Sequence, residues 1–105
     1  MEHLEHLTKI MSKYDAALDE VSDAQKYAKE AIYAKNVEAK DLYLSMAKQE
    51  LSHAKNLCHI ADIILDTDDA EHVRGTRTVW DEMKAHIDAW SMEVREKIDR
   101  VERNR

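Results

Sequence analysis

Residues 37–65 read VEAKDLYLSMAKQELSHAKNLCHIADIIL, and this stretch decides the fold class. Its apolar residues recur at alternating steps of three and four, which places them along one face of an α-helix. Two polar residues stand in this predicted seam, which comprises Ala39, Tyr43, Met46, Glu50, His53, Leu57, Ile60 and Ile64. The spacing does not slip, so we predict one unbroken helix over 37–65.

The stretch before it carries the same periodicity and predicts a helix over 2–34. The apolar seam of this helix comprises Leu4, Leu7, Met11, Tyr14, Leu18, Val21, Ala28 and Ile32, with Gln25 as its one polar member. A row of small residues (Ala17, Ala24 and Ala31) runs beside the seam and would allow a neighbouring helix to approach closely. Asn36 is placed to end this helix or to cap the next one.

A third helix is predicted over 77–103. Its apolar face comprises Trp80, Met83, Ile87, Trp90, Val94, Ile98 and Val101. Asp68 and Glu71 have the spacing of a capping box ahead of it, and Gly75 is expected to mark a kink or joint. The sequence therefore predicts an all-α fold, in which a long antiparallel hairpin is joined by a third helix.

Composition agrees with this fold class and limits the function. The chain has 105 residues with one Gly and no Pro, so we expect a single helical domain spanning 1–105. A net charge of −6 argues against nucleic acid as a partner, and no apolar run reaches the length of a membrane span. The first residues are too polar for a secretory signal, and the lone Cys58 suits a reducing compartment, so we expect a cytoplasmic protein.

The number of helices also predicts self-association. Helices this long favour a four-helix arrangement, which three helices do not close. We therefore expect a homodimer or a higher homo-oligomer, most simply one with two-fold symmetry.

Glu50 and His53 are the candidate metal ligands. A carboxylate among apolar neighbours costs several kcal/mol unless it is paired, hydrogen-bonded or bound to a metal. Residues at i and i+3 share a helix face, so both side chains could reach one ion. In a hairpin that turns near residue 36, Glu20 stands level with Glu50. Oxygen and imidazole donors suit iron, manganese or zinc better than calcium.

The run Glu50-Leu-Ser-His53-Ala54 resembles the Glu-x-x-His-Ala helix of the rubrerythrin-like branch of the ferritin-like superfamily. Glu20 followed by Tyr27 is similar to the first-helix Glu and Tyr of that branch. The separation of Glu20 from Glu50 also resembles that in encapsulated ferritins, whose two-helix chains pair into a four-helix bundle. The resemblance covers roughly residues 14–65.

This resemblance implies a site that holds two irons and oxidises ferrous iron with oxygen or peroxide. It implies that Glu20 and His53 are terminal ligands, that Glu50 is a bridging or terminal carboxylate, and that Tyr27 lies near the metal. A complete site needs a second Glu and a second Glu-x-x-His. The third helix offers only Glu82, His86 and Glu93. Either a dimer supplies the second set by symmetry or the site is incomplete.

The alternative is a helical structural or protein-interaction module without enzymatic activity. In that interpretation, Glu50 and His53 form a buried hydrogen-bonded pair that specifies how the helices align.

Overall fold

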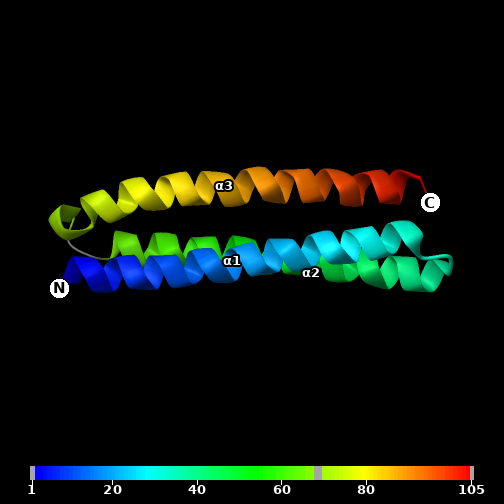
Figure 1. Ribbon diagram of the computed structural model, residues 1–105, viewed down its shortest axis with the longest axis horizontal. Coiled ribbons are helices and arrows are strands. Elements are labelled where there is room, and N and C mark those ends of the chain that lie inside the picture. The colour runs from blue at the N-terminus through cyan, green and yellow to red at the C-terminus, as the bar shows by residue number, and fades with distance from the viewer. Residues whose placement is uncertain (1, 68–69, 105) are drawn as a thin grey trace.

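A computed structural model of the protein describes residues 2–67 and 70–104, with side chains for residues 5, 7–67 and 74–104. It consists of three α-helices: α1 (Glu2–Tyr33), α2 (Val37–Asp66) and α3 (Ala70–Arg103). The three lie along one axis, and the molecule measures 54 × 16 × 16 Å (Figure 1). The predicted all-α fold, with α1 and α2 as a long antiparallel hairpin, is confirmed.

The helices do not pack equally. The α1–α2 interface is the most extensive, α3 packs mainly on α1, and α2 and α3 touch least. In Figure 1, α3 runs above the hairpin, and the two chain ends lie at opposite ends of the molecule. Within the described residues, none of the helices combines the length and apolarity needed to cross a membrane.

The helix ends follow local chemistry. Asn36 precedes α2 with an extended backbone, and its Oδ1 accepts a hydrogen bond from the Ala39 amide at 3.0 Å, as expected of an N-cap. The third helix begins at Ala70, earlier than predicted, and it continues through Gly75 without interruption. The capping box that we predicted from Asp68 and Glu71 lies outside the described residues.

Small residues form the interface between α1 and α2. In α1 the row Ala17, Ala24 and Ala31 is fully buried, as predicted, together with Val21 and Ala28. The buried face of α2 is also rich in small side chains and comprises Leu44, Ala47, Ala54, Cys58, Ala61 and Leu65. Small side chains let two helix backbones approach closely, which explains why α1 and α2 make the most extensive contact.

The predicted seam of α2 is not its core face. None of its members, from Ala39 to Ile64, is fully buried, and Met46, His53 and Ile60 are exposed. The seam forms a half-covered apolar stripe beside the true interface. A hydropathy pattern predicts that the larger side chains of the stripe are buried, because they are the most apolar. Close helix packing instead buries the smaller side chains next to them.

Polar contacts attach α3 to the hairpin. The indole Nε1 of the fully buried Trp80 donates to Asp62 Oδ1 at 2.8 Å, and Lys84 Nζ donates to Asp62 Oδ2 at 2.7 Å. Trp90 Nε1 donates to Gln25 Oε1 at 3.1 Å. Gln25, the one polar residue of the α1 seam, therefore holds α3 in its orientation on α1. The predicted apolar face of α3 is confirmed as the side that packs on α1 and α2.

Replacing Ala24 with Leu is expected to destabilise the protein by about 1–3 kcal/mol, because the larger side chain would force α1 away from α2. Chemical denaturation measures this loss. Ala85→Leu, at an exposed position of α3, is the matched control and should change stability by no more than about 0.5 kcal/mol. Equal effects of the two substitutions would contradict the close α1–α2 interface.

Candidate metal centre

The structure brings Glu20 of α1 together with Glu50 and His53 of α2, at the border between the two helices. His53 Nδ1 lies 3.6 Å from Glu20 Oε2 and 3.9 Å from Glu50 Oε1. One donor atom from each residue lies within 4.8 Å of the other two. Among the described residues this is the only group of three or more such side chains with the spacing of a metal site.

The cluster lies on the side of the hairpin that α3 does not cover. Asp62 marks the side of α2 that contacts α3. His53 precedes it by nine residues, so the two point about 180° apart around the helix, at about 100° per residue. The cluster therefore faces away from α3 and borders the half-covered stripe of α2.

The distances suit a shared ion better than direct hydrogen bonds. Both His53 contacts exceed the range of a good hydrogen bond. Two ligands bound at about 2.1 Å to one ion lie about 3.0–4.2 Å apart when the angle between them is 90° or more. In addition, Glu20 Oε2 is buried, and the described part of the chain offers it no hydrogen-bond donor other than the protonated carboxyl group of Glu50. This oxygen is therefore available to the proton of Glu50 or to a cation in its place.

Glu50 and His53 were both expected to be shielded from solvent, and this holds for Glu50 only. The Glu50 side chain is 20% exposed and that of Glu20 is 28% exposed, but the His53 side chain is 58% exposed. The imidazole therefore lies at the exposed rim of the cluster. The buried Glu–His pair of the alternative interpretation is therefore wrong about His53.

The two carboxylates share a proton near neutral pH. The pKa of Glu50 is raised from 4.5 to about 7, first because its protonated form hydrogen-bonds to Glu20, then because of burial and the negative charge of Glu20. The charge of His53 acts in the opposite direction, and Asp23 adds a smaller increase. A cation bound between the carboxylates would displace this proton, so metal affinity should rise with pH up to about 7.

The raised pKa of Glu50 makes folding stability depend on pH. The folded state holds this proton up to about pH 7, whereas the unfolded chain releases it near 4.5. The stabilisation is complete below pH 4.5 and is lost as pH rises through 7. Because solvent reaches the pair, we expect a loss of about 1–2 kcal/mol between pH 5 and pH 8.

Thermal unfolding of the metal-free protein at several pH values measures this loss. The isosteric Glu50→Gln variant should not show the loss of stability between pH 5 and pH 8 that comes from Glu50. The exposed Glu82→Gln control should still show it. If the Glu50→Gln and wild-type proteins showed the same pH dependence, the shared proton would be disproved.

Other residues singled out in the sequence do not join the cluster. Tyr27 is half-buried and packs against the core, and no described contact links its hydroxyl to the carboxylates. Glu82, His86 and Glu93 are exposed on α3, which lies across the hairpin from the cluster. Within the described residues, α3 does not provide a second set of ligands.

A second group of titratable residues, which we did not predict, lies between α2 and α3. Asp62, Lys84 and Cys58 border a cavity of about 490 Å³. Burial raises the pKa of the Cys58 thiol to about 11, so it stays protonated and unreactive. Burial would raise the pKa of Asp62, but hydrogen bonds from Lys84 and Trp80 outweigh it and lower the pKa. The spacing of Cys58 and Asp62 is one helical turn, a signal too common to have identified the group.

Comparisons with protein-family models, curated proteins and solved structures found no match for this chain. The features that indicate the class of protein are therefore the three-helix fold and the cluster of Glu20, Glu50 and His53.

Proposed function

We propose that this chain is a ferritin-like metal-binding protein that holds iron with Glu20, Glu50 and His53. The observation that carries the proposal is the spacing of the three donors, which fits ligands of one ion and is too long for hydrogen bonds to His53. Two carboxylates and one imidazole form a donor set suited to iron, with manganese and zinc as the next choices.

The roles of the three side chains follow from their positions. Glu20 and Glu50 supply negative charge, which favours a cation at the cluster and stabilises its higher oxidation state. Glu50 gives up its proton as the cation binds, so the two ionised carboxylates together neutralise a divalent cation. His53, at the rim, leaves one side of the site open to small molecules. Bound iron would supply redox chemistry, and the reaction that we propose is oxidation of ferrous iron, in which oxygen or peroxide accepts the electron that each iron loses.

Three protein ligands leave the coordination of iron incomplete. We propose that a second copy of the chain covers the open face of the hairpin and brings its own Glu20, Glu50 and His53 beside the first set. The apolar stripe of α2 supports this pairing, because Met46, Leu57, Ile60 and Ile64 remain partly or largely exposed in one chain. We also propose a cytoplasmic location, with which the buried and unpaired Cys58 thiol agrees.

Elemental analysis tests the metal site. Protein produced with supplied iron and then desalted should retain about one iron per chain, because the described residues of each chain offer one such cluster of donors. The Glu50→Ala and His53→Ala variants should retain much less. Wild-type protein that carries no transition metal under these conditions would refute the proposal.

Light scattering tests the pairing. The wild type should have twice the 12.2 kDa mass of one chain. Ile60→Glu, which puts a charge on the stripe at a residue 42% exposed, should give monomers. Val79→Glu, at a residue of α3 that is 40% exposed, is the matched control and should remain dimeric. A wild type that is monomeric at all concentrations would exclude a centre shared by two chains.

The second candidate function is a helical interaction module without a metal. The exposed apolar stripe of α2 favours it, because such stripes also bind partner helices. Binding of a partner helix would not require Glu20, Glu50 or His53. Glu50→Leu/His53→Leu would then be neutral or stabilising in thermal unfolding, and a large loss of stability would argue against it.

A further inference from the structure

The apolar stripe of α2 is symmetric about its own centre. Its members, from Ala39 to Ile64, alternate between steps of four and three residues, and the centre falls midway between Glu50 and His53. Any regular stripe is symmetric in spacing, but here the two polar members also occupy the two middle positions. The polar pair therefore has three apolar or aromatic residues of the stripe on either side of it.

The side of α1 that borders the metal cluster is more polar than the stripe. The residues one or two turns from Glu20 that are not buried are Lys13, Ala16, Asp23 and Tyr27. Two of these four are charged, and none is a large aliphatic residue. In α2, by contrast, Met46 is 38% exposed and Ile60 is 42% exposed. Because most of the apolar surface on this face belongs to α2, a second copy covers more of it with its own stripe than with its α1.

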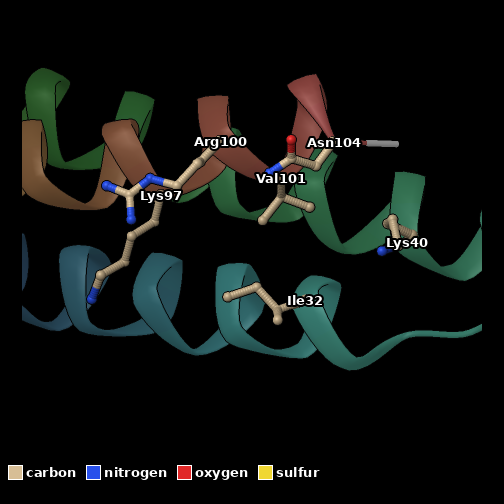
Figure 2. Close-up of a pocket in the computed structure, with 6 residues that line it drawn as sticks. All are labelled: Ile32, Lys40, Lys97, Arg100, Val101 and Asn104. Atoms are coloured by element: carbon tan, nitrogen blue, oxygen red, sulfur yellow. The ribbon is translucent and has the colours of Figure 1, made fainter.

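Another partly exposed apolar surface lies near the hairpin turn and does not suit the pairing of two copies. It belongs to an open cavity of about 270 Å³, in which Ile32 of α1 and Val101 of α3 lie beside Lys97 and Arg100 (Figure 2). A symmetric contact at this cavity would bring the cations of the two copies together, which is unfavourable. The stripe of α2 carries no cationic residue apart from a protonated His53.

The polar residues of the stripe also distinguish the possible orientations of two paired α2 helices. In a parallel pair, Glu50 of one chain would lie beside Glu50 of the other, and the like charges would repel. In an antiparallel pair centred on the middle of the stripe, Glu50 of each chain faces His53 of the other, and apolar residues face apolar ones. A slip of seven residues would instead place Glu50 against Met46 or Ile60. Since a polar group buried against apolar ones costs free energy, the centred antiparallel pair is favoured.

We propose that two copies of the chain pair through their α2 stripes in an antiparallel arrangement, with the two-fold axis midway between Glu50 and His53. This inference rests on the pairing in the proposed function and specifies which residues meet. Stripe residues at equal distances from the centre face one another across the axis: Ala39 and Ile64, Tyr43 and Ile60, and Met46 and Leu57. The His53 side chain, 58% exposed in one chain, is then covered by the other chain beside its Glu50.

Disulfide trapping of the metal-free protein tests this arrangement. In a Cys58→Ala background, which removes the native thiol, Met46→Cys/Leu57→Cys should form a dimer on mild oxidation. Two disulfides should link residue 46 of each chain to residue 57 of the other. The two positions lie about 16 Å apart along one helix, so they cannot be bridged within a chain. Mass spectrometry of proteolytic peptides identifies the linked residues.

The single variants are the matched controls. Met46→Cys alone places its two thiols about 16 Å apart in the proposed dimer, and so does Leu57→Cys alone. Each should crosslink at least about tenfold less than the double variant, because Cα atoms more than about 7 Å apart cannot be bridged without backbone movement. Tyr43→Cys/Ile60→Cys, one turn farther from the centre, should crosslink like the first double variant and replaces it if that variant fails to fold.

Three results would overturn the proposal. Efficient crosslinking of Met46→Cys with itself would indicate a parallel pair. A dimer in which neither double variant crosslinks would indicate a different contact between the copies, while leaving the proposed pairing itself intact. A chain that is monomeric in light scattering would exclude both. Because all of these measurements use metal-free protein, none of them decides whether the cluster of one chain binds iron.

Discussion

The Glu20→Gln/Glu50→Gln variant is expected to bind a divalent transition metal at least about a hundredfold more weakly than the wild type. Two of the three converging donors would lose their negative charge, and a neutral amide oxygen is a poorer ligand. Competition with a coloured chelator, using Co²⁺ in place of oxygen-sensitive iron, measures the change in affinity.

The same variant should be more stable than the metal-free wild type at pH 8. Amide groups do not repel one another and can hydrogen-bond to each other, so we expect a gain of about 1 kcal/mol, or roughly 4–8 °C in melting temperature. Glu82→Gln/Glu93→Gln removes two carboxylates from the exposed surface of α3 and is the control. A loss of stability without a loss of metal affinity would mean that the two residues serve the fold instead of a metal.

Trp80→Ala is expected to cost about 3–5 kcal/mol, the largest stability loss of any single truncation that we consider. Trp80 is fully buried, and its indole nitrogen is one of the few polar links between α2 and α3. The truncation would leave a cavity and remove a donor from Asp62. Because small domains have stabilities of about 5–15 kcal/mol, this loss should lower the melting temperature by more than about 12 °C.

The second tryptophan provides the comparison. Trp90 is only half-buried, and its indole donates to Gln25 over a longer distance, so Trp90→Ala should cost clearly less than Trp80→Ala. Circular dichroism during thermal unfolding measures both. Equal losses for the two variants would contradict a larger contribution of the fully buried Trp80 to the packing of α3.

Much of the fold could be predicted because composition and periodicity agree. The apolar face of α3 is correct from Trp80 to Val101, since that helix has one strongly amphipathic pattern. The alanine row of α1 was also recognised as an interface, because small residues at helical spacing permit close approach. Residue type alone predicts that Asn36 either ends α1 or caps α2, and the hydrogen bond from the Ala39 amide shows that it caps α2.

The orientation of α2 could not be predicted, because this helix carries two apolar rows. One row has large side chains, such as Met46, Leu57 and Ile60, and the other has small ones, such as Ala47 and Ala54. Hydropathy favours the first row, but the structure buries the second, against the alanines of α1. Which row of α2 is buried depends on how well its side chains fit against those of α1. The pattern of one helix alone does not carry this information.

The proximity of Glu20, Glu50 and His53 could be predicted better than their environment. The hairpin register brought Glu20 level with Glu50 correctly, because a short turn at Asn36 fixes which residues face one another. The exposure of His53 was missed, since it follows from the rotation of α2. The start of α3 was missed because the helix was predicted only from residue 77, after a kink or joint at Gly75. The helix instead begins at Ala70 and includes Gly75, where a single Gly costs only about 1 kcal/mol.

Paramagnetic NMR with substoichiometric Mn²⁺ tests the central claim most directly, because a bound ion broadens the signals of nearby nuclei. The expected result is broadening centred on Glu20, Glu50 and His53 that saturates near one ion per chain and disappears in the Glu20→Gln/Glu50→Gln variant. Broadening spread over the exposed acidic residues of α3, or none at all, would contradict a metal centre between α1 and α2.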